Sequence, residues 1–70
     1  MFNGHRSWNA WNISLWIGND EKLYRLALKC LQQRKTRMAA ARLFLTVCPT
    51  RTPDGGKFNL TCVYEAMEEM

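Results

Sequence analysis

The sequence contains one segment that should interrupt regular secondary structure, between residues 49 and 56, where both of its prolines and two of its four glycines lie. Pro53 suits the second position of a tight turn because its ring fixes φ, and Asp54-Gly55 supplies the reversal that follows. The segment is therefore predicted to be a turn rather than part of a regular element. Residues 50–58 lie on both sides of this reversal and can pair as a minimal hairpin.

The segment of residues 7–17 allows two interpretations. An apolar set that includes Trp8, Trp11 and Leu15 follows helical spacing, whereas alternate residues are apolar in its second half, as in a strand. Ser7 is a suitable N-cap, and a lone strand would lack a pairing partner. A short helix is therefore favoured.

Three further helices are expected from capping residues and apolar spacing. Their N-caps are Asn19 or Asp20 before residues 21–33, Thr36 before residues 38–48, and Asn59 before the C-terminal residues. The first of these helices is expected to bury Leu23, Tyr24, Ala27, Leu28, Cys30 and Leu31. The sequence thus predicts a single domain, residues 1–70, that is all-α or nearly so, a small bundle of three to four short helices.

A chain of 70 residues must hold its fold by packing, because it is near the lower limit for a core without disulfides or metal. Trp11, Trp16 and Leu15 are therefore assigned to the core, and Trp8 to its exposed edge. The alternative is that the tryptophans form a binding surface, either as a platform for stacked bases or as anchors in a protein interface.

Cys30, Cys48 and Cys62 lie far apart among apolar residues, so they are interpreted as small buried side chains in a reducing compartment. No two cysteines are closely spaced and His5 is the one histidine, so we expect no metal site and no cofactor. No stretch approaches the roughly 18 apolar residues of a membrane span. We expect a soluble, cytoplasmic protein with no membrane partner.

The charges are distributed unevenly along the chain, whose net charge is +4. Eight basic residues and no acid lie between Lys22 and Arg51, whereas Glu65, Glu68 and Glu69 crowd the end. A face that only meets water normally mixes both signs, so we predict an anionic partner, either nucleic acid or an acidic protein face. The alternative is a solvated helix face. The predicted partner-binding residues are the cations of the second helix and its following corner, with one aromatic anchor: Lys22, Arg25, Lys29, Arg34, Lys35, Arg37 and Trp8.

Catalysis is not expected. His5 has no paired nucleophile, the acids cluster on one predicted face, and Gly55-Gly56 lacks the strand, lysine and helix of a phosphate-binding loop. An enzyme is therefore not the favoured interpretation.

The segment Trp11-Asn12-Ile13-Ser14-Leu15-Trp16-Ile17-Gly18-Asn19-Asp20-Glu21, followed by Leu23-Tyr24, resembles a family of short proteins carried by bacteriophages and related mobile elements. That family also tends to carry a Thr-Pro-Asp-Gly turn before a final helix, as Thr52-Pro53-Asp54-Gly55 does here. The resemblance implies a setting rather than an activity. Residues 39–67 are also similar, in spacing and residue class, to the accessory DNA-binding region of large serine recombinases, which implies a helix-turn-helix-like unit.

Taken together, the residues and the resemblance predict a phage-type protein that inhibits or redirects a host macromolecule by stoichiometric binding, with anti-defence activity as its form. Its expected partner is a host protein or ribonucleoprotein complex in the bacterial cytoplasm. The alternative is a helix-turn-helix-like DNA-binding module in which the last helix lies in a groove and the turn from Arg51 to Lys57 contacts phosphates as a wing. The glutamates on the exposed side of that helix would be repelled by the DNA backbone, so the second helix is the better candidate if DNA is bound. Monomer and homodimer both stay open.

Overall fold

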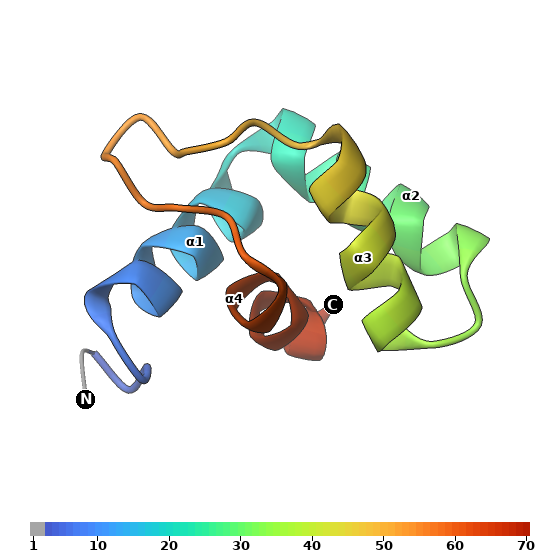
Figure 1. Cartoon of the computed structure of the whole chain (residues 1–70), viewed down its shortest axis with the longest axis horizontal. Coiled ribbons are helices and arrows are strands. Elements are labelled where there is room, and N and C mark those ends of the chain that lie inside the picture. Colours follow the sequence, from blue (N-terminus) through green and yellow to red (C-terminus); the bar gives the residue numbers. More distant parts are fainter. Residues whose placement is uncertain (1–2) are drawn as a thin grey trace.

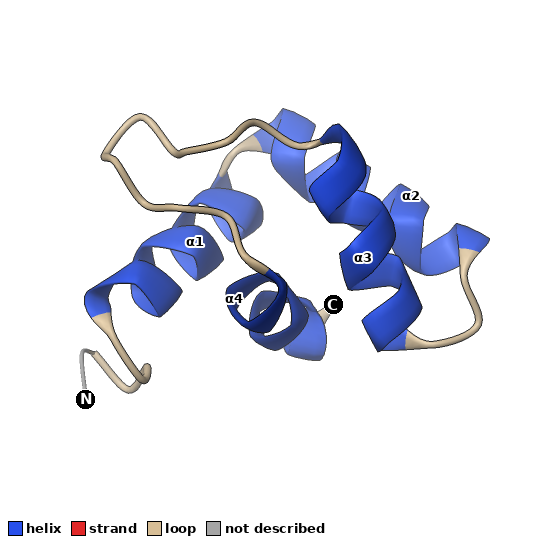
Figure 2. Cartoon of the chain, in the orientation of Figure 1, coloured by secondary structure: helices blue, strands red, loops and turns tan. Residues whose placement is uncertain are grey.

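The computed structural model describes residues 3–70, without the side chain of Glu69, and within them shows four α-helices (Figures 1 and 2). They are α1 (Trp8–Asn19), α2 (Glu21–Gln33), α3 (Arg37–Val47) and α4 (Leu60–Ala66), and the 3-10 helix η1 (Met67–Glu69) follows. The all-α prediction is confirmed, and the segment that also resembled a strand is helical. None of the described helices has the length and apolar character needed to cross a membrane.

Each α-helix begins at a cap that the sequence predicted, because a side-chain oxygen accepts a hydrogen bond from a backbone N–H of the first turn. The acceptors are Ser7 for α1 at 3.1 Å, Asp20 for α2 at 3.0 Å, Thr36 for α3 at 3.1 Å and Asn59 for α4 at 2.9 Å. Local hydrogen bonding therefore fixes where the helices start.

The helices pack in a closed order: α1 and α3 each contact both α2 and α4 (Figure 1). Ile13 of α1, Phe44 of α3 and Val63 of α4 are fully buried where they meet. The loop between α3 and α4 adds Phe58, whose ring centroid lies 6.0 Å from that of Phe44. The radius of gyration of 10.9 Å matches the value of about 11 Å expected for a folded chain of this length.

The loop after α3 runs back over α1 before it enters α4 (Figure 1). The predicted hairpin is reduced to a single antiparallel bridge between Arg51 and Lys57, with Thr52 N–H donating to Gly56 O at 2.8 Å. Gly55 closes the turn at a φ of 95°, which favours glycine. The loop is thus a defined turn without strands.

The assignment of Leu15, Trp11 and Trp16 to the core was wrong. Helix α1 buries the opposite side, through Ala10, Ile13 and Ile17, while Leu15 is 37% exposed. Trp11 and Trp16 are only half-buried. Both sides of α1 carry apolar residues, so helical spacing alone did not distinguish the inner from the outer side.

Helix α2 buries the predicted side with one exception. Ala27 and Cys30 are buried, and Leu23 and Leu31 pack against the core, but Tyr24 is 40% exposed. Tyr24 follows Leu23 directly, so it points about 100° around the helix axis from Leu23. It lies at the edge of the buried side.

Candidate functional site

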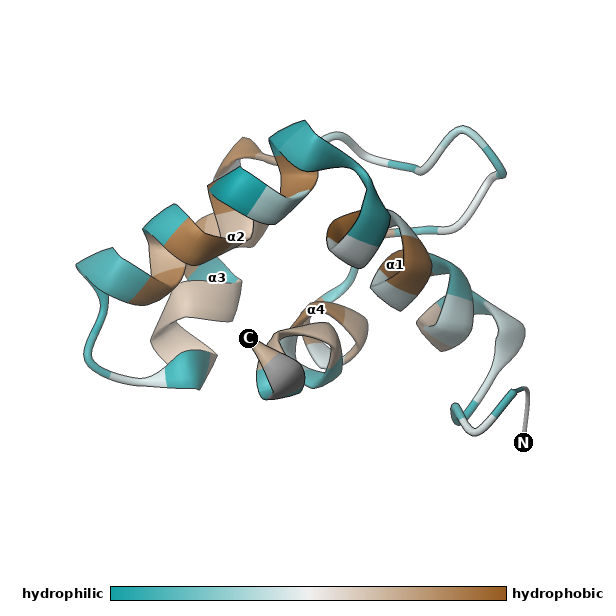
Figure 3. Ribbon diagram, turned by 180° about the vertical axis from the view of Figure 1, so that it is seen from behind, coloured by the Kyte–Doolittle hydropathy of each residue, from teal (hydrophilic) through white to brown (hydrophobic). Residues whose placement is uncertain are grey.

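The predicted cations of α2 lie on its outer side. Lys22, Arg25 and Lys29 are all exposed, opposite the buried Ala27 and Cys30, because they recur at helical spacing. Figure 3 shows hydrophilic positions along this helix. The Arg25 guanidinium lies 2.7 Å from the Glu21 carboxylate one turn earlier, with both side chains about three-quarters exposed. A pair so exposed contributes little stability.

The corner between α2 and α3 continues the positive surface. Arg34 and Lys35 are exposed there, and α3 runs back beside α2 (Figure 1). Arg34 also lines a shallow hollow of about 340 Å³ together with Arg42 on the outer side of α3. Sequence reasoning left Arg42 out of the site, although it belongs to the same acid-free stretch. We call the following six cations the basic hairpin: Lys22, Arg25, Lys29, Arg34, Lys35 and Arg42.

Arg37 does not belong to this surface. Its guanidinium lies 3.8 Å from the centre of the Tyr64 ring and 3.9 Å from the Glu68 carboxylate. Its side chain is 30% exposed and joins the start of α3 to the C-terminal helices. Arg37 therefore has partners inside the molecule, and we remove it from the predicted contact residues.

Trp8 is 40% exposed, as predicted for an edge position, but it is not close to the basic hairpin. It is the first residue of α1, and Figure 1 places the start of α1 and the corner between α2 and α3 at opposite ends of the molecule. The structure therefore does not combine Trp8 with the cations in one site.

The acids of the C-terminal region are turned toward other cations. Glu65 of α4 accepts a hydrogen bond from Arg6 at 3.0 Å, and Glu68 approaches Arg37. Glu69 was predicted to join them, but its side chain lies outside the described part. The pairing leaves the basic hairpin without these acids, so the charge is separated along the molecule.

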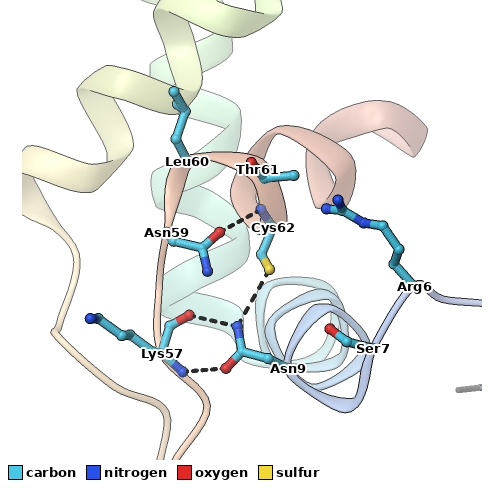
Figure 4. Close-up of a pocket in the computed structure, with 8 residues that line it drawn as sticks. All are labelled: Arg6, Ser7, Asn9, Lys57, Asn59, Leu60, Thr61 and Cys62. Atoms are coloured by element: carbon cyan, nitrogen blue, oxygen red, sulfur yellow. Dashed lines mark hydrogen bonds between the residues drawn. The ribbon is translucent and has the colours of Figure 1, made fainter.

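A second surface feature is an open groove of about 580 Å³ where α1, the loop and α4 meet (Figure 4). Its lining residues are Arg6, Ser7, Asn9, Lys57, Asn59, Leu60, Thr61 and Cys62. The Asn9 amide donates to Lys57 O at 2.9 Å and accepts from Lys57 N–H at 2.7 Å, as a neighbouring strand would. These two hydrogen bonds hold the loop against α1.

The same loop is held more firmly one turn along α1. The buried Asn12 amide accepts a hydrogen bond from the Thr52 hydroxyl at 2.6 Å and donates to Asp54 at 3.0 Å. Trp16 Nε1 also donates to Asp54, at 2.8 Å. The hydrogen bond from Trp16, which has the larger effect, and the one from Asn12 lower the pKa of the Asp54 carboxyl. We call Asn12, Trp16, Thr52 and Asp54 the loop clamp.

The thiols show no sign of activation. Burial raises the pKa of the Cys30 thiol and that of the Cys48 thiol, although nearby cations oppose the rise at Cys30. All three cysteines are free. Among the residues described, no three metal-ligating side chains come together.

One comparison with known proteins gives a match. A model of a family of unknown function (DUF7249) covers residues 1–70. Neither a curated protein nor a solved structure matches the chain. By its whole length, the chain belongs to the family of unknown function DUF7249.

Proposed function

We propose that this protein works by stoichiometric binding, in which the basic hairpin docks on an anionic face of a host macromolecule and blocks or redirects it. One observation carries the proposal. Within the described part of the chain, only Arg25 of the six hairpin cations has an acid within ion-pair distance. The other five are exposed on two adjacent helices and on the corner that joins them.

An unpaired positive surface of this kind attracts anionic partners and speeds their encounter. Occlusion needs only such a surface, so a chain of 70 residues is large enough for it. The resemblance to proteins of bacteriophages supplies the setting: an anti-defence or host-takeover inhibitor in the bacterial cytoplasm. Its target would be an acidic face of a host protein or ribonucleoprotein complex.

A second candidate is DNA binding through the same hairpin. Arg34 and Arg42 line one hollow. In the loop, an antiparallel bridge joins the backbones of Arg51 and Lys57, and these two cations can approach phosphates as a wing. Helix α4 is poorly suited as a recognition helix in a DNA groove, because it packs against α1 and α3 and carries Glu65. Phosphates would be repelled by that acid.

The test reverses charge on α2 without disturbing the Glu21–Arg25 pair. In Lys22→Glu/Lys29→Glu, both changed residues are exposed, so we expect the melting temperature to stay close to that of the wild type. The matched single variants are Lys29→Glu and Lys57→Glu, which change the net charge equally but lie on α2 and on the loop. Capture from nuclease-treated bacterial lysate should fall for Lys29→Glu and further for the double variant. It should not fall for Lys57→Glu, because the nuclease removes the DNA that Lys57 could contact.

Salt dependence separates the two candidates. A labelled DNA duplex bound by the hairpin should lose affinity with a slope of about 0.9 per neutralised phosphate in a plot of log affinity against log salt. A protein partner should survive nuclease and show a shallower slope that acts mainly through the association rate. If the double variant captures the same partner at the same rate and salt dependence as the wild type, the hairpin is only a solvated surface.

A further inference from the structure

The outer side of α1 exposes two large apolar side chains, Trp8 and Leu15. Trp8, Trp11, Leu15 and Gly18 follow one another along it at spacings of three, four and three residues, which keeps them on one side of a helix. Trp8 is 40% and Leu15 37% exposed, and Trp11 between them is half-buried. This side points away from the core residues Ile13 and Ile17.

The same surface carries no charge. From Ser7 to Asn19 the sequence contains neither an acid nor a base, although the whole chain has a net charge of +4. A helix side that meets only water is normally rich in charged residues. An uncharged aromatic side fits a partner whose own contact face is apolar and uncharged, and it does not attract the anionic partner of the basic hairpin.

The order of large and small residues along α1 is self-complementary. In an antiparallel pair of α1 helices centred on residue 13, Trp8 of one copy lies opposite Gly18 of the other, and Trp11 lies opposite Leu15. A Cβ atom added at Gly18 would meet nothing within 4 Å, so the space beside this glycine is open in the single chain. The indole of a second copy can fill it, and a twofold axis repeats the contact.

We propose that the protein forms a symmetric dimer through the outer side of α1. Identical chains with a charge of +4 repel one another. The corner between α2 and α3, which carries Arg34 and Lys35, lies far from the start of α1 in a molecule 30 Å long, whereas Lys22 follows directly after the end of α1 (Figure 1). At physiological salt, charges more than about 8 Å apart are largely screened. The uncharged side of α1 is therefore a region where two copies can meet without strong repulsion.

The contact between the two helices is small. A helix of 12 residues is about 18 Å long, so one side of it buries on the order of 400 Å² per copy, half of a standard interface. The dimer should be weak and depend on concentration. Sedimentation equilibrium between about 10 μM and about 1 mM should show the monomer giving way to the dimer.

Gly18→Leu is the decisive variant, because it should weaken the dimer without destabilising the monomer. Leucine favours the helix more than glycine and meets no neighbour in the single chain, so the melting temperature should hold or rise. In the dimer the new side chain occupies the place of the partner's Trp8, and the dissociation constant should rise at least tenfold. Trp8→Ala should also weaken the dimer, whereas Trp8→Ala/Gly18→Leu should bind more tightly than either single variant.

Val47→Glu serves as the control, since Val47 is 56% exposed but lies on α3. It should leave the dissociation constant unchanged, as should Lys29→Glu, whose residue lies two turns further along α2 than Lys22. Failure of the dimer is thus distinguishable from failure of the basic hairpin. A wild type that stays monomeric at about 1 mM, or a dimer that Gly18→Leu does not weaken, would overturn the proposal.

Discussion

Asn12 shows what the motif residues of α1 do. Its amide is completely buried, yet both ends are used: the oxygen accepts from Thr52 and the nitrogen donates to Asp54. Gly56 lies so close that an added Cβ would overlap with the amide oxygen. The segment that begins at Trp11 and the Thr-Pro-Asp-Gly turn therefore meet in space, and their side chains hold the loop on α1.

Thr52→Val tests this role with little change in shape. The hydroxyl donates to Asn12 and accepts from Gly56 N–H at 2.9 Å, so valine leaves a buried acceptor and a buried donor without partners. We expect a loss of about 1–3 kcal/mol in the free energy of unfolding, measured by urea titration. Thr52→Ser keeps the hydroxyl and should lose less. Equal stability of the valine variant and the wild type would show that the loop clamp does not hold the loop.

Helix α1 shows how far sequence reasoning reached at the scale of an element. Its cap, its helical character and its approximate length were predicted, because Ser7 and the apolar spacing are local signals. Its inner side was not, because apolar residues lie all around the helix and only the contacts with α2 and α4 decide which of them are buried. Helix α2 was predicted almost fully, because its charged and apolar sides are distinct.

A pair of truncations on α1 distinguishes its two sides. Ile13 is fully buried, so Ile13→Ala should lower the free energy of unfolding by about 2–5 kcal/mol. Leu15 is 37% exposed, and Leu15→Ala should cost less than about 1 kcal/mol in the monomer at low protein concentration. Thermal melts of both variants below about 10 μM would measure the difference. The reverse order of stabilities would mean that α1 packs with its tryptophan side inward.

At the scale of the whole molecule, the sequence predicted the fold class and the position of the charges but not their partners. The sequence shows that residues 22–51 contain no acid, but it does not show which of their cations lie on the same surface. In the fold, Arg37 contacts Tyr64 and Glu68, while Arg42 lies beside Arg34 in the basic hairpin. Long-range pairs such as Arg6 with Glu65 depend on tertiary contacts that no local pattern encodes. The predicted cations of α2 therefore lie together on one exposed side, Arg37 lies apart from them, and their role in binding stays a prediction.

The three thiols can report whether these helices open together. Cys30 on α2 and Cys62 on α4 are buried, Cys48 at the end of α3 is half-buried, and burial raises the pKa values of Cys30 and Cys48. The thiolate is the reactive form, so iodoacetamide should label the native protein slowly at neutral pH, Cys48 first. If a domain of this size unfolds in one step, Cys30 and Cys62 should then react at one shared rate, set by global opening. Mass spectrometry of digested samples gives the rate at each site, with ~6 M urea as the unfolded control, where all three thiols should react quickly. Labelling of Cys62 well ahead of Cys30 would show instead that α4 detaches from a core still held by α1, α2 and α3.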